Sequence, residues 1–154
     1  EYDAFYAAVH ELLSRAQKDH GRFVVLDLHT YNHRRNGPDA EPADPIDNPE
    51  VNIGTGSMNR RRWGHVVDRF IDDLRATGVQ GRALDVRENV KFRGGHLSRW
   101  VHENFPDSGC SIAVEFKKFF MDEWTGEPDL ACVEAIRNAL SKCVPGILLE
   151  LSVP

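Results

Sequence analysis

The segment FVVLDLHTYNHRR, residues 23–35, decides the fold, because an apolar run passes directly into charged chemistry. Residues 23–29 are short and rich in β-branched side chains, which is typical of a strand buried on both faces. A helix is expected over residues 2–18, where apolar residues recur at spacings of three and four until Gly21 ends the pattern. In open α/β sheets, ligands bind beyond the carboxyl ends of the strands, so this junction is the first candidate for a site.

Helix and strand signals alternate along the rest of the chain. The expected elements are helices over residues 59–77, 96–105 and 128–142, strands over 83–88 and 111–119, and a short apolar tail over 144–151. Residues 30–57 contain four prolines and few periodic apolar residues, and loops this long are usually functional or disordered. The alternation predicts a single domain over residues 1–154, built as a three-layer α/β sandwich with a mostly parallel or mixed sheet.

Composition excludes several classes of protein. The formal net charge of -5 disfavours nucleic-acid binding, which needs a basic surface, although the patch Arg60–Arg62 keeps it as a minor hypothesis. No apolar run approaches the roughly 20 residues that span a bilayer, so no membrane association is expected. The chain opens EYDAFYAAVHELL, with neither an initiator Met nor the basic start of a signal peptide, so its natural N-terminus is expected upstream. Three cysteines without CxxC spacing favour a reduced, cytoplasmic setting.

Asp27, His29 and Glu115 are the candidate catalytic and metal-binding residues. Asp27 and His29 are two apart at the end of a strand, so their side chains point to the same face of the sheet. His29 is the candidate metal ligand, with Asp27 as the acid that orients it, unless His29 only bonds its own loop. Glu115 lies opposite the apolar face of its strand and is a candidate general base or acid. The alternative is a buried ion pair of Glu115 with Lys117, Arg93 or Arg99.

Two glycine-rich segments are candidate anion sites. NIGTGSMNRRRW precedes a helix, where backbone N–H groups bind anions, although a plain turn with a Ser or Asn cap explains it equally well. Its arginines, residues 60–62, occupy the first helical turn, where the helix dipole disfavours cations by about 0.3–1 kcal/mol each. Either a bound anion offsets that cost or the arginines form a solvated patch.

The second segment, KFRGGHLSRW, combines close backbone approach at Gly94 and Gly95 with arginines that can clamp a carboxylate, Arg93 and Arg99. Three histidines are weaker candidates. His33 would share a face with His29 only if the segment turned helical, and His96 and His102 are compatible with ordinary positions on a helix surface.

The segments VVLDLHT, NIGTG, NVKFRGGHLSRWVHENFP and SIAVEFKKFFMDEW, in this order, resemble the N-formylglutamate amidohydrolase family. The resemblance implies a phosphorylase/hydrolase-like α/β fold, akin to zinc exopeptidases and aspartoacylases. It implies zinc-dependent hydrolysis of the amide bond of a small acidic N-acyl amino acid such as N-formylglutamate. On this resemblance His29 ligates zinc, which activates water, and Glu115 assists proton transfer. Asp27 orients His29, and Arg93 or Arg99 holds the substrate carboxylate beside Gly94 and Gly95.

The sequence departs from the family at its N-terminus. Family members carry an earlier segment with a histidine-containing PHxG-type motif, which is expected to complete the metal site. A catalytic zinc usually takes three protein ligands plus water, whereas His29 alone is well supported here. The alternative function is therefore a non-catalytic domain that binds an anionic metabolite or a partner within a larger protein.

Overall fold

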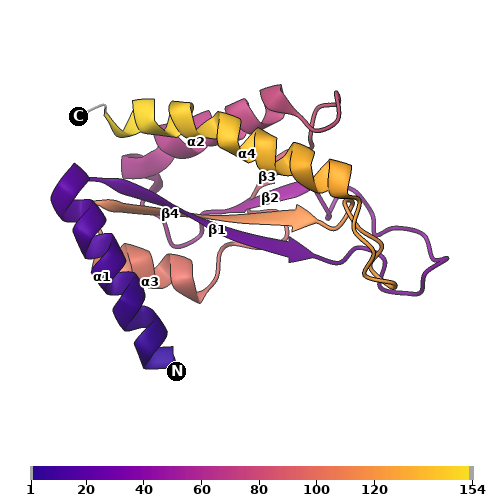
Figure 1. Cartoon of the computed structure of the whole chain (residues 1–154), viewed down its shortest axis with the longest axis horizontal. Coiled ribbons are helices and arrows are strands. Elements are labelled where there is room, and N and C mark those ends of the chain that lie inside the picture. The colour runs from indigo at the N-terminus through magenta and orange to yellow at the C-terminus, as the bar shows by residue number, and fades with distance from the viewer. Residues whose placement is uncertain (1, 153–154) are drawn as a thin grey trace.

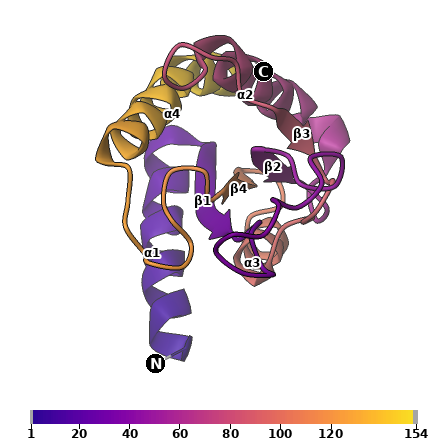
Figure 2. The same cartoon turned by 90° about the vertical axis from the view of Figure 1, so that its right-hand side faces the viewer.

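The computed structural model describes residues 2–152 and places its helices on both faces of one sheet. The elements are α1 (Tyr2–His20), β1 (Phe23–Tyr31), β2 (Val51–Gly54), α2 (Arg60–Thr77), β3 (Val86–Glu88), α3 (His96–Asn104), β4 (Gly109–Lys117) and α4 (Leu130–Leu151). Helices α2 and α4 cover one face, and α1 and α3 lie against the other (Figures 1 and 2). The expected three-layer α/β sandwich is therefore confirmed.

The sheet is mixed, with strand order β1-β4-β2-β3. Strand β1 pairs with β4 in parallel and β2 pairs with β3 in parallel, but β2 runs antiparallel to β4. Strand β2 lies inside residues 30–57, so the prediction of an uninterrupted polar loop there was wrong. Its four residues are too few to show a period, and the strand is defined by its pairing with β4, which lies about sixty residues further along the chain.

Strand β1 is an edge strand, and the exposure of residues 28–30 corrects the expectation that both of its faces are buried. Its alternate residues Val24 and Leu26 pack against the core under α2 and α4, but Leu28 is 55% exposed. Within residues 2–152 no strand pairs with its outer edge. An edge strand presents unpaired backbone groups and needs cover from elsewhere.

The main core lies between the sheet and the α2–α4 layer. Helix α2 contributes an inward face of Trp63, Val66, Val67, Phe70, Ile71 and Leu74, all buried. Helix α4 continues through Pro145 to Leu151, so the prediction of a separate apolar tail was wrong. The packing of buried Cys143 and Ile147 in the same core keeps this last part helical, which tertiary contact favours over local propensity. Among the helices of residues 2–152, none has both the length and the apolar character needed to cross a bilayer.

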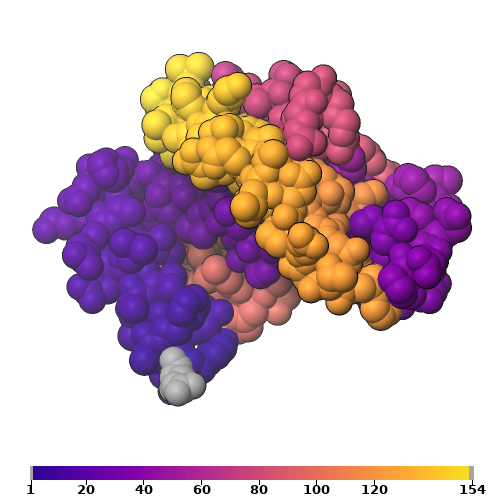
Figure 3. All heavy atoms as spheres, turned by 45° about the vertical axis from the view of Figure 1, so that its right-hand side comes forward, coloured from indigo at the N-terminus to yellow at the C-terminus, as the bar shows by residue number. Residues whose placement is uncertain are grey.

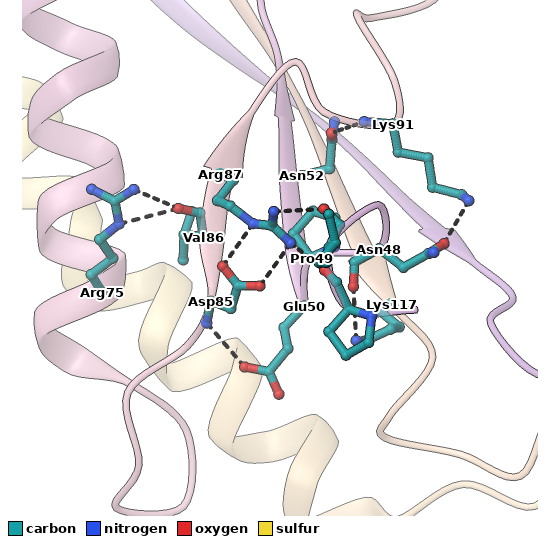
Figure 4. A network of polar contacts seen from close by, with 12 residues as sticks. Asn48, Pro49, Glu50, Asn52, Arg75, Asp85, Val86, Arg87, Lys91 and Lys117 are labelled. Carbon is teal, nitrogen blue, oxygen red and sulfur yellow. Dashed lines mark hydrogen bonds and ion pairs between the residues drawn. The ribbon is translucent and has the colours of Figure 1, made fainter. Parts of the chain in front are cut away.

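Polar contacts hold the long segment after β1 against the sheet (Figure 4). Arg87 of β3 donates to the carbonyl oxygens of Pro45 and Ile46, and Lys117 Nζ donates to the carbonyl of Asn48 at 2.9 Å. The segment also lies alongside residues 118–128, the chain that follows β4 (Figures 1 and 3). Although long and proline-rich, it is fixed at the carboxyl ends of β1 and β4.

Candidate functional site

A row of three polar side chains crosses the face of the sheet beneath α1 and α3. In the strand register His29 of β1 pairs with Glu115 of β4, which in turn pairs with Asn52 of β2. Paired residues of neighbouring strands point to the same face, so the three side chains lie side by side. Asp27 belongs to the same face, and its Oδ1 lies 2.7 Å from Nε2 of His29. The predicted common face of Asp27 and His29 is confirmed, and the strand register adds Glu115 to this face.

The row is buried on one side and open on the other. Asp27 is buried, whereas the side chain of His29 is 49% exposed, so a small molecule can reach the imidazole. Burial raises the pKa of Glu115, the nearby His29 lowers it and the charge of Asp27 raises it again. Glu115 makes no hydrogen bond or ion pair with another side chain of the described chain, so the alternative of a buried ion pair is not found. A carboxyl with a raised pKa, free of a partner, suits proton transfer.

Residues of β2 hold the glycine-rich loop before α3 in place through hydrogen bonds and close backbone contact. Asn52 is fully buried, and its Oδ1 accepts from the backbone N–H of Lys91 at 2.8 Å and of Phe92 at 3.3 Å. Its Nδ2 donates to the Phe92 carbonyl at 2.8 Å. Gly54 lies so close to this loop that an added Cβ would be 2.5 Å from the Gly94 nitrogen. The NIGTG motif therefore positions Arg93 and Gly94 through backbone contact, which only glycine permits here.

The predicted substrate-binding residues separate into two groups. Arg93, Gly94 and Gly95 sit on this loop, and the exposed Arg93 side chain has no polar partner within residues 2–152. Gly94 adopts a φ of +96°, a backbone region that L side chains rarely enter. Arg99 is an exposed residue of α3, a helix whose buried residues are Ser98 and Val101, so it lies away from the buried face.

The histidines of α3 make specific contacts. His96 lies between two phenols of α1, with Nε2 at 2.8 Å from Tyr2 Oη and Nδ1 at 2.8 Å from Tyr6 Oη. His102 Nε2 accepts the backbone N–H of Ser111 at 3.0 Å, at a position of β4 that β2 is too short to reach. Burial lowers the pKa of His102, which keeps the ring neutral and able to accept that hydrogen bond.

His33 pairs with an acid from the segment after β4. Its Nδ1 lies 2.5 Å from Oε1 of Glu123, which also accepts the backbone N–H groups of His33 and Arg34. Burial alone would raise the pKa of Glu123, but these hydrogen bonds hold it below the usual value. His33 therefore joins the two loops at the carboxyl ends of β1 and β4 and does not share a site with His29.

Two of the three arginines at the start of α2, Arg60 and Arg62, are compensated by acids of the same chain. Asn59 caps the helix by accepting from the backbone N–H of Arg62, so the alternative of a turn with an Asn cap is correct. Arg60 forms ion pairs with Asp68 and Glu88, and Arg62 pairs with Asp107; these carboxylates supply the negative charge that a bound anion would have supplied. No anion site is needed to explain this patch.

The donor set was tested against the zinc that the family resemblance implies. No three His, Cys, Asp or Glu side chains among residues 2–152 are grouped so that they could hold a metal ion. His29 supplies one imidazole, and its Nε2 is already engaged by Asp27. Because a catalytic zinc usually takes three protein ligands, these residues alone do not fit it.

The mixed, helix-covered sheet carries Asp27, His29 and Glu115 on one face, near the carboxyl ends of β1 and β4. This arrangement defines a three-layer α/β protein with a hydrolase-like fold. A family model described as N-formylglutamate amidohydrolase matches residues 1–120, and the chain belongs to this family. The crystal structure of N-formylglutamate amidohydrolase from Ralstonia eutropha JMP134 has a TM-score of 0.70 and 18% sequence identity, over 99% of this chain and 52% of that one. The chain thus spans about half the length of that protein, and the likeness shows the fold. No curated protein matches.

The sequence patterns assigned no role to three residues that the structure connects to distant segments, Asn52, Glu123 and Lys91. Asn52 lies in a strand of four residues, which is too short to show a period, and its position follows from pairing with Glu115 of β4. Glu123 and Lys91 were hidden because their partners, His33 and Asn48, lie 90 and 43 residues away. No local pattern predicts such contacts.

Proposed function

We propose that this chain supplies catalytic residues for hydrolysis of the amide bond of a small acidic N-acyl amino acid, of the N-formylglutamate type. The observation that carries the proposal is the raised pKa of Glu115 beside the solvent-accessible His29, which Asp27 holds in place. Family membership supports the reaction class, and the matching protein from Ralstonia eutropha carries the same activity in its name.

In the proposed reaction, Glu115 takes a proton from a water molecule, which attacks the carbonyl carbon of the amide. The water oxygen forms the new C–O bond while the C–N bond breaks, and Glu115 returns the proton to the departing amine. Nε2 of His29 lies 2.7 Å from Oδ1 of Asp27, which leaves Nδ1 of the ring available for a hydrogen bond with the attacking water. Arg93, exposed and unpartnered in the described chain, would hold a substrate carboxylate.

Zinc at His29 stays a prediction, and no step above depends on it. The measurement is metal content after zinc loading and desalting, compared between the wild-type chain and His29→Ala. About one zinc per chain, lost in the variant, would support the predicted ligand. Equal zinc content in both would contradict it.

The activity test measures formate release from N-formyl-L-glutamate by the wild-type chain, Glu115→Gln and the matched control Glu103→Gln. Glu103 is an exposed residue of α3 without a polar partner in the described chain. Glu115→Gln should lower turnover by roughly 10²–10⁴-fold, because general acid–base catalysis contributes about that much. Unchanged turnover in Glu115→Gln, or no release by the wild type, would overturn the proposal.

A second candidate function is a non-catalytic domain that binds an anionic metabolite or a partner. It is favoured by the lack of a three-ligand metal group in residues 2–152 and by the half-length match to the solved structure. Carboxylate binding that a chelator does not change, in a chain without turnover, would favour it.

The three cysteines are buried and free, which suits the predicted cytoplasmic location.

A further inference from the structure

We propose that the cavity at the end of β1, lined by Lys91, Arg35 and Asn32, binds the distal carboxylate of a dicarboxylic N-acyl amino acid. This inference rests on the proposed function and adds a second anchoring point to the same substrate. The cavity has a volume of about 460 Å³ and is enclosed by the segment after β1 and by Asn48 and Lys91. It therefore has room for a carboxylate group and its hydration water.

The lining of this cavity offers many hydrogen-bond donors and few acceptors. The side chains of Arg35, Asn32 and Asn36 have no polar partner among the described residues. Lys91 uses one of its three donors on Asn48. The acid that lines the cavity is Glu41, an exposed residue. Two cations against one exposed carboxylate favour an anionic ligand.

His33 also lines the cavity, without adding charge. Burial lowers the pKa of His33, although the neighbouring Glu123 opposes this shift. Its Nδ1 faces Glu123, on the side of the loop after β4. The charge of the cavity is therefore set by Lys91, Arg35 and Glu41.

Lys91 is held in place before any ligand binds (Figure 4). Its Nζ lies 2.6 Å from Oδ1 of Asn48 and 5.4 Å from the ring centroid of Tyr31. Asn48 is buried, and its own Nδ2 donates to the Asp44 carbonyl at 2.8 Å, so the amide cannot turn freely. Lys91 forms no ion pair with any residue of the range 2–152. A fixed ammonium group without a carboxylate partner loses little conformational entropy when it binds one.

The cavity begins where β1, the strand that carries His29, ends, because Asn32 lines it and follows Tyr31 directly. Tyr31 follows His29 by two residues on the same face of β1, a rise of roughly 7 Å. The buried ring of Tyr31 contacts the Lys91 ammonium group, with 5.4 Å between Nζ and the ring centroid. In the proposed pose the amide of the substrate lies at Glu115 and its far carboxylate lies at Lys91, both toward the carboxyl end of β1.

Calorimetric titration with three probes tests the inference. N-formyl-L-glutamate carries both carboxylates, N-formyl-L-alanine lacks the distal one, and glutarate lacks the amide. The proteins are wild type, Lys91→Met, Arg35→Met and the control Lys142→Met, an exposed residue of α4 without a polar partner in the described chain. Methionine keeps an unbranched side chain at position 91 and removes the charge, and the exposed Arg35 gives a second variant in case Lys91→Met destabilises the loop.

Lys91→Met should weaken binding of N-formyl-L-glutamate and of glutarate by about tenfold or more, the usual worth of one charge-assisted contact. Arg35→Met should act in the same direction, and both should leave N-formyl-L-alanine unchanged. Equal weakening of all probes, no weakening, or failure of the wild type to bind glutarate would overturn the inference. Glutarate binding that depends on Lys91, without formate release, would sustain the subsite while the hydrolytic function fails. If the wild type releases formate and Lys91→Met still prefers N-formyl-L-glutamate over N-formyl-L-alanine as the wild type does, the subsite is overturned while the hydrolytic function stands.

Discussion

Replacing Gly54 by alanine should displace the loop that carries Arg93 and Gly94. The new Cβ would lie 2.5 Å from the Gly94 nitrogen and 2.9 Å from the carbonyl carbon of Arg93, whereas ordinary van der Waals contact begins at 3.4 Å. Both neighbours are backbone atoms, so no side-chain rotation can relieve the contact. Either β2 or the loop must move by about 0.9 Å, relative to that 3.4 Å limit.

The cost of this movement can be worked from the contacts that oppose it. Overpacking of a well-packed site costs about 1–3 kcal/mol. Asn52 holds the loop through hydrogen bonds to Lys91 and Phe92, each worth about 0.5–1.5 kcal/mol if lost. We expect the free energy of unfolding to fall by about 2–4 kcal/mol. For a chain of this length, that lowers Tm by roughly 4–16 °C.

Urea unfolding followed by tryptophan fluorescence measures this change. Gly95→Ala is the matched control, because a Cβ there meets no atom within 4 Å and the φ of -99° suits alanine. Unchanged m-values would show that the denatured state is unaffected. A loss of less than about 0.5 kcal/mol for Gly54→Ala relative to Gly95→Ala would refute the role of Gly54 as the contact that seats the loop.

Four further predictions concern other contacts. Glu123→Gln should cost about 1–3 kcal/mol at pH 7, because a buried acceptor of two backbone N–H groups is weakened. The pKa of Glu123 is lowered, so this loss should shrink as pH falls through its folded-state pKa; a pH-independent loss in urea titrations would contradict it. Glu115→Gln should have the opposite effect, because the raised pKa of Glu115 means that its carboxylate form destabilises the fold. The variant should be more stable than the wild type above the folded-state pKa and equally stable below about pH 4. Destabilisation at pH 8 would refute this. His102→Ala should cost about 1–3 kcal/mol and speed hydrogen exchange at Ser111, whose N–H loses its acceptor; unchanged protection would count against it. Leu28→Lys should leave Tm unchanged and raise the protein concentration at which light scattering detects aggregates, because a charge on the exposed edge strand opposes association there. An unchanged aggregation threshold would show that the edge of β1 is not the site of association.

The sequence by itself determined the features that depend on neighbours along the chain. Alternation of helix and strand signals predicted the layered α/β fold, and the period of two predicted that Asp27 and His29 share a face. The predicted helix over residues 59–77 was also found, as α2 (Arg60–Thr77), because apolar residues recur there at helical spacing. The family motifs were recognised because they are contiguous runs of sequence.

Only the tertiary structure decided the features that depend on residues far apart. It placed Asn52 beside Glu115, put β1 at the edge of the sheet, and carried α4 past Pro145. It also brought Lys91 to Asn48 and Tyr31, which gives the cavity at the end of β1 its cation. Propensity and periodicity act within a few residues, whereas strand order and ion placement follow from which distant surfaces bury one another, and that choice leaves no local trace in the sequence.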